Sequence, residues 1–152
     1  MARDPLQVLL RLRRLAVDDA RRTLADRLRS EGAAADALAE IRDQMRQQTE
    51  IVQNAGTDLR LAQAFGTWLE WAEPRRRGAF AAVQAAEGET ASARLVLADE
   101  RAAMRAVETL IDKQDADRQA AAQRSEQRDL DEAGHPARGL DRTAGAARTE
   151  SP

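Results

Sequence analysis

The stretch from Leu6 to Asn54, LQVLLRLRRLAVDDARRTLADRLRSEGAAADALAEIRDQMRQQTEIVQN, decides the fold. It contains no proline, and its one glycine, Gly32, costs a helix only about 1 kcal/mol relative to alanine. Counting by sevens from Leu10 gives a column that is apolar at six of seven positions: Leu10, Val17, Leu24, Glu31, Leu38, Met45 and Val52. Such a sustained heptad column predicts a coiled-coil helix that packs along a partner helix.

A second, weaker column accompanies the first. Small or apolar residues alternate there with polar ones, in the order Arg13, Ala20, Arg27, Ala34, Ile41 and Gln48. A narrow seam of this kind suits a two-stranded coil better than a thick bundle. Asp4 followed by Pro5 is a strong helix start, because Asp caps free backbone N–H groups and proline suits the first turn. A helix of about 50 residues is about 75 Å long and therefore needs an equally long partner.

The partner helix is predicted further along the same chain. One apolar column runs through Val83, Thr90, Leu97, Met104 and Ile111. The other runs through Ala86, Ala93 and Val107, with Glu100 and Gln114 as polar exceptions. Gly56 marks a short turn between the two helices, and Thr57 or Asp58 is the candidate cap of the second. Because the turn is short, helices that pair within one chain must run antiparallel.

The predicted fold is therefore all-α: an antiparallel coiled-coil hairpin over residues 1–133, with helices at about 5–54 and 58–131. Pro74 must kink or break the second helix, so two separate helices are the alternative. The apolar pattern thins after Ile111, which predicts a loosely packed end. Residues 134–152 combine Gly, Pro, Ala and Arg without an apolar period, and we predict that this tail is disordered.

Charge and composition limit the kinds of partner. The chain has 24 basic and 26 acidic residues, and they are interspersed. Nucleic-acid binding needs a concentrated basic face, so no nucleic-acid partner is expected. The first thirty residues hold eight arginines against four acids, which leaves non-specific nucleic-acid binding as a distant alternative. No signal peptide or membrane-spanning run is recognisable, which predicts a cytoplasmic protein.

No catalytic, cofactor-binding or metal-binding site is expected. The only lysine, Lys113, is not part of a glycine-rich phosphate loop, and the only histidine, His135, falls in the predicted tail. Asp115 and Asp117 have the spacing of some metal ligands, but neither a glycine turn nor a distal glutamate accompanies them. Asp115 and Asp117 are better explained as part of a solvated helix face, and His135 as an exposed loop residue.

Three of the four aromatic residues, Phe65, Trp68 and Trp71, lie within seven positions. They either pack across the closed end of the hairpin or form an exposed anchor for a protein partner, since Trp is enriched at binding hot spots. The two tryptophans do not both fit a narrow seam together with Phe65 and Leu61. We therefore expect at least one of them to be exposed.

Several stretches resemble the flagellar export-apparatus FliJ family, which is related to the stalk proteins of virulence-type type III secretion systems. The resemblance is strongest in VETLIDKQDADRQAAAQRSEQRDLDEAG, residues 107–134. It extends to LRRLAVDDARRTLA, residues 12–25, and to FGTWLEWAE, residues 65–73. The positions that match the family's C-terminal pattern are Glu108, Leu110, Gln127, Arg128, Asp131 and Glu132. Pro74 departs from the family, which usually has a continuous helix there.

The resemblance implies a stalk that enters the pore of a hexameric flagellar export ATPase and also contacts the export-gate membrane protein and export chaperones. It also implies a peripheral position at the cytoplasmic face of the inner membrane. One tip of the hairpin would meet the ATPase ring through Arg11, Arg13, Arg14, Arg128, Asp131 and Glu132. The other tip, with Phe65, Trp68 and Trp71, would meet the export gate. A virulence-type stalk and a generic coiled-coil scaffold are the alternatives.

Overall fold

The computed structural model describes residues 4–134. The predicted disordered tail, apart from Gly134, lies outside the described residues, and so does His135. Two helices make up almost all of the described chain: α1 (Pro5–Asn54) and α2 (Leu59–Ala133). The predicted class of two long helices is confirmed.

Local interactions explain where each helix begins and where α1 ends. A carboxylate oxygen of Asp4 accepts from the backbone N–H of Leu6 at 3.0 Å, as expected for an N-cap. Asp58 caps α2 in the same way, since it accepts from the N–H groups of Arg60 at 3.0 Å and Leu61 at 3.3 Å. Between the helices Gly56 has a φ of 67°, a left-handed conformation that glycine adopts at little cost.

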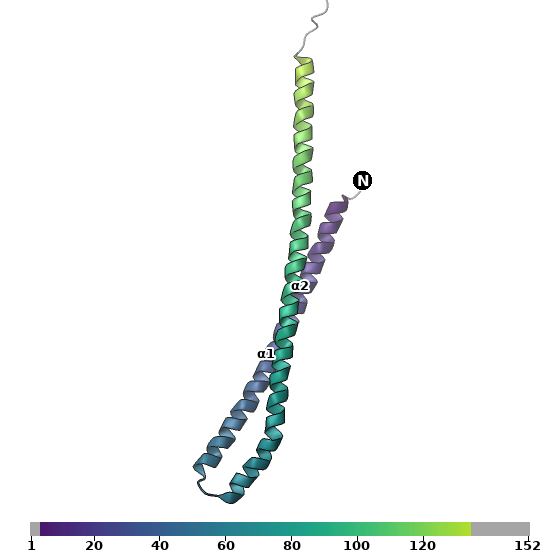
Figure 1. Cartoon of the computed structure of the whole chain (residues 1–152). Coiled ribbons are helices and arrows are strands. Elements are labelled where there is room, and N and C mark those ends of the chain that lie inside the picture. Colours follow the sequence, from purple (N-terminus) through teal and green to yellow (C-terminus); the bar gives the residue numbers. More distant parts are fainter. Residues whose placement is uncertain (1–3, 135–152) are drawn as a thin grey trace, which may run out of the picture. The chain divides into compact units, whose positions relative to one another are not determined.

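The described residues form two parts, 4–108 and 109–134, and α2 contributes to both. In the first part, α1 and α2 lie side by side and run in opposite directions from the turn (Figure 1). Two ion pairs show that the helices are antiparallel. Arg13 pairs with Glu100, whereas Arg27, later in α1, pairs with Glu89, which comes earlier in α2. The predicted antiparallel hairpin is confirmed.

The core of the hairpin consists of the predicted heptad columns. The buried apolar residues of the first part of the chain are Leu10, Val17, Ala20, Leu38, Ala72, Ala93, Leu97 and Val107. Four of them belong to the columns counted from Leu10 and Val83, namely Leu10, Val17, Leu38 and Leu97. Ala20, Ala93 and Val107 belong to the two weaker columns, and Ala72 lies two heptads before Ala86. At the centre of the contact, Val17, Ala20 and Leu97 form one cluster, against which Leu24 and Met104 pack. The core is narrow because each layer takes only one or two side chains from each helix.

α2 continues through Pro74 without a break, so the alternative of two separate helices is wrong. Proline lacks an N–H donor and its ring crowds the preceding turn, which bends a helix. Figure 1 shows this bend in the teal part of α2, a short way above the hairpin turn. The predicted kink therefore lies within one continuous helix.

The second part, residues 109–134, consists of the end of α2 and Gly134. Ile111 is buried and Gln114 is half-buried, whereas every residue from 115 to 134 is exposed. Polar residues occupy all faces of this segment, and local ion pairs such as Arg118–Asp115 at 3.5 Å stabilise it. The thinning of the apolar pattern after Ile111 accounts for this exposure.

Candidate protein-binding site

The three arginines predicted for the ATPase tip lie in the first turns of α1. Two of them reach α2: Arg13 Nη1 lies 3.4 Å from Glu100 Oε2, and Arg14 Nη2 lies 3.6 Å from Glu108 Oε1. The side chains of Arg13 and Arg14 stay 41% and 62% exposed, so both guanidinium groups remain accessible to a partner. Arg11 is exposed and, with Asp4, Gln7 and Val8, lines a shallow depression.

Arg128, Asp131 and Glu132 lie in the last turns of α2, and all three are exposed. The Nε of Arg128 donates to the backbone carbonyl of Arg124 at 3.3 Å, which turns this side chain back along its own helix. Proximity between these three residues and the arginines of α1 stays a prediction.

The aromatic cluster near the turn divides into an inner pair and an outer residue. Phe65 and Trp68 are half-buried, and their rings stack with centroids 5.9 Å apart and an interplanar angle of 20°. Trp71 is 54% exposed, which confirms that at least one tryptophan faces solvent. The Cζ of Arg75 lies 4.3 Å from the centroid of the Trp71 ring, within cation–π range. An exposed indole held by a stacked guanidinium is a rigid, amphipathic surface feature that suits a protein contact.

A second exposed apolar group was not predicted. Val8, Leu12 and Leu15 recur at intervals of four and three residues and are 44%, 57% and 56% exposed. This spacing places them together on the side of α1 opposite the core columns. The heptad count could have identified this exposed group, because its three residues occupy the positions farthest from the Leu10 and Arg13 columns.

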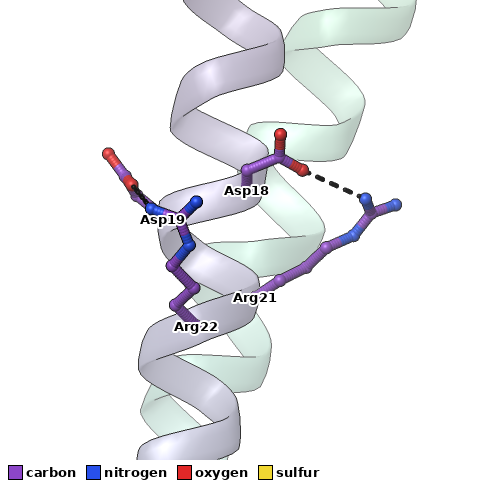
Figure 2. Close-up of polar contacts among 4 residues, drawn as sticks. All are labelled: Asp18, Asp19, Arg21 and Arg22. Atoms are coloured by element: carbon purple, nitrogen blue, oxygen red, sulfur yellow. Dashed lines mark hydrogen bonds and ion pairs between the residues drawn. The ribbon is translucent and has the colours of Figure 1, made fainter.

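The next positions on this face of α1 after Leu15 are charged, namely Asp19 and Arg22. Figure 2 shows Arg21 paired with Asp18 at 3.2 Å and Arg22 paired with Asp19 at 3.5 Å, on the exposed sides of α1. These pairs form within one helix at a spacing of three residues. The apolar group therefore ends at Leu15, and the following turns of α1 are hydrophilic on the outside.

Within residues 4–134, no group of three or more His, Cys, Asp or Glu side chains could hold a metal ion. Neither of the two described helices contains a stretch that is long and apolar enough to span a bilayer.

A comparison with protein-family models identifies the family of this chain. The model described as "Flagellar FliJ protein" matches residues 1–137. The chain belongs to the FliJ family. FliJ proteins are structural components of the flagellar export apparatus, and the family is not a known enzyme family. No curated protein and no solved structure matches the chain.

Proposed function

We propose that this FliJ protein is a non-catalytic stalk of the flagellar type III export apparatus. In this role it binds and regulates the hexameric export ATPase, couples the ATPase to the export gate, and contacts export chaperones. It works in the cytoplasm, at the cytoplasmic face of the inner membrane, where the gate holds it. Membership of the FliJ family supports a place in the flagellar export apparatus. The antiparallel hairpin is the observation that supports the role of a stalk.

The hairpin has the physical properties that a stalk needs. Two helices packed along shared apolar columns resist bending more than one helix does, and the narrow core keeps the cross-section small. Most of the outer surface of α1 carries both charges, so it can touch several subunits of a ring without binding any of them tightly.

The arginines at the start of α1 are the candidate contact with the ATPase. The ion pairs of Arg13 and Arg14 with α2 are partly exposed and therefore weak, so a carboxylate on a partner can compete for these guanidinium groups. Arg128, Asp131 and Glu132 are the candidate contributions of α2. The exposed Trp71, supported by the stacked pair of Phe65 and Trp68, is the candidate contact with the gate.

Reconstitution with the matching ATPase tests the main proposal. The purified chain should promote hexamer formation and change the rate of phosphate release. Replacing Arg11, Arg13 and Arg14 by alanine should reduce both effects. The matched control is R21A/R22A, which removes two exposed arginines of the same helix that pair only locally (Figure 2). Unchanged hexamer formation and phosphate release at concentrations where the two proteins associate would contradict the proposal.

Binding to the isolated cytoplasmic part of the export gate tests the other tip. Trp71→Ala should weaken this binding about tenfold or more, as truncation of a hot-spot tryptophan usually does. Phe80→Ala is the control, because Phe80 is also an aromatic residue of α2 and is 43% exposed. Equal effects of the two substitutions would remove Trp71 from the proposed site.

A further inference from the structure

The outer side of α1 is apolar in its first turns. Val8, Leu12 and Leu15 are 44%, 57% and 56% exposed, and Leu9 beside them is 37% exposed. We call these four residues the N-terminal patch. The core column through Val17 lies on the other side of the helix, so the packing of α1 against α2 leaves the patch uncovered.

The rest of the outer side of α1 shows what an ordinary solvated surface of this hairpin looks like. Its outward positions after Leu15 begin with Asp19, Arg22, Asp26 and Arg29, all of which are charged. Four large apolar side chains within eight residues are therefore a local feature of the first turns. An exposed apolar group with polar residues around it marks a surface that binds a protein or a membrane.

Arginines border the N-terminal patch along one edge. Arg11 comes three residues after Val8 and four before Leu15, so it is adjacent to both on the helix surface. Arg14 comes three residues after Arg11 and extends this edge. Both arginines are exposed, and the 3.6 Å ion pair of Arg14 with Glu108 leaves the side chain of Arg14 62% exposed. The patch therefore combines apolar bulk with accessible positive charge.

The charge around the patch differs from that of the whole chain. Residues 5–17 contain three arginines and no acidic residue, whereas the chain carries a net charge of −2. Glu100 and Glu108 of α2 offset part of this excess, because they pair with Arg13 and Arg14. The complementary partner is anionic, and attraction to it must arise at this site because the protein as a whole is not cationic.

The size of the patch favours a bilayer over a second protein. From Val8 to Leu15 it extends only about 10 Å at 1.5 Å per residue. A stable protein interface takes about 20–30 residues from each side, so four apolar residues and two arginines are too few. A bilayer sets no such minimum, because a few inserted apolar side chains and adjacent basic residues already give reversible binding to anionic lipids.

We propose that the N-terminal patch binds the surface of a bilayer that contains anionic lipids. Its four apolar side chains insert between the headgroups, while Arg11 and Arg14 extend to the lipid phosphates and form charge-assisted hydrogen bonds with them. The first turns of α1 lie in the interface, parallel to the bilayer surface. This contact with lipid is additional to the proposed contact with the export gate and does not depend on it.

The outward residues that follow limit the contact to the first turns of α1. Asp19 and Asp26 come seven and fourteen residues after Leu12, on the same side of the helix. They form ion pairs with Arg22 and Arg29 at the surface, and such charged side chains do not enter an apolar layer. Because so few side chains insert, we expect weak and reversible binding.

Co-sedimentation of the full chain with lipid vesicles tests the proposal. Vesicles of phosphatidylcholine with about one-third phosphatidylglycerol should bind the chain, and pure phosphatidylcholine should bind it at least about tenfold more weakly. Leu12→Glu should weaken binding to the anionic vesicles at least about tenfold, because it places a carboxylate in the apolar layer.

The matched control is Leu95→Glu, which makes the same change at a leucine of α2 that is 69% exposed. The residues three and four positions from Leu95 include Asp99 and no basic residue, so this substitution should leave vesicle binding intact. Circular dichroism verifies that both variants fold. A wild-type chain that does not bind the anionic vesicles, or equal losses in the two variants, would overturn the proposal.

A second pair of variants tests the arginines at a constant net charge. R11Q/R14Q should weaken binding to the anionic vesicles about tenfold or more, since a basic residue near such a surface contributes about fivefold. R21Q/R22Q also removes two exposed arginines of α1 but should change binding little. Equal effects would show that binding follows net charge alone, which would contradict a local site.

A fluorescent label tests the insertion of the patch, since the chain has no native cysteine. The environment-sensitive fluorophore NBD on L12C should shift to the blue when anionic vesicles are added, and the same label on L95C should not. Equal shifts would overturn the proposed orientation. These experiments use neither ATPase nor gate protein, so a failed vesicle assay leaves the proposed stalk function untouched, and a failed ATPase assay leaves the lipid contact standing.

Discussion

Arg13 of α1 and Glu100 of α2 face each other across the hairpin, with the guanidinium Nη1 donating to the carboxylate Oε2 at 3.4 Å. Each of these residues interrupts an apolar column of its own helix. Arg27, the next charged interruption in α1, pairs with Glu89 in the same manner. The charged interruptions therefore fix the register, because sliding one helix by a heptad would set these arginines against apolar positions.

A double-mutant cycle on Arg13 and Glu100 should detect this pairing. Arg13→Ala and Glu100→Ala should each lower the free energy of unfolding slightly, with a coupling energy of about 0.5 kcal/mol, because a pair that is one-third exposed is screened by water and salt. Urea denaturation followed by circular dichroism measures the four proteins. A coupling energy of zero would mean that the ion pair does not contribute to the register.

Truncating a side chain of the central cluster should lower the free energy of unfolding by much more than breaking the ion pair does. Leu97 is 6% exposed and packs with Val17 and Ala20, so Leu97→Ala should lower the free energy of unfolding by about 2–3 kcal/mol. Leu12→Ala is the control, because Leu12 is 57% exposed and its loss should cost less than about 0.5 kcal/mol. Thermal unfolding monitored at 222 nm would compare them, and similar losses would contradict the assignment of the core.

The heptad columns were readable from the sequence because a long coiled coil has one dominant physical constraint. Each layer of the core repeats every seven residues, so Leu10, Val17, Leu97 and Ile111 could be identified as buried by counting alone. Caps were equally local: Asp4 and Asp58 act on N–H groups two or three residues away. Patterns of this kind need no knowledge of distant contacts.

The pairing of particular side chains was not readable in the same way. Either column could have slipped by a heptad, so the ion pair between Arg14 and Glu108 required the register that the structure supplies. The cation–π contact of Arg75 with Trp71 was missed although its spacing of four residues is visible in the sequence. Heptad counting identifies the residues that face the core, whereas Trp71 and Arg75 are both exposed.

Two glycine substitutions should have opposite effects on stability. Gly32 lies inside α1, and a Cβ added there meets no atom within 4 Å, so Gly32→Ala should raise the free energy of unfolding by about 1 kcal/mol. Gly56 has a φ of 67°, so Gly56→Ala should lower it by about 1 kcal/mol because a Cβ disfavours the left-handed conformation. Urea titration of the two variants decides the matter, and a stabilising Gly56→Ala would show that the turn does not require this conformation.

Thr90 is the one fully buried polar residue of the described core, at 1% exposure, and its hydroxyl has no hydrogen-bond partner. It occupies a column position that an aliphatic residue would fill without stranding a polar atom. Thr90→Val should therefore raise the free energy of unfolding by about 1 kcal/mol, since valine has nearly the same shape and buries no unpaired hydroxyl. Thr67→Val is the control: Thr67 is exposed and its hydroxyl donates to the carbonyl of Gln63 at 3.3 Å, so little change is expected. If Thr90→Val destabilised the hairpin instead, the hydroxyl must be hydrogen-bonded in solution, and hydrogen exchange at the neighbouring amides would locate the site of that bond.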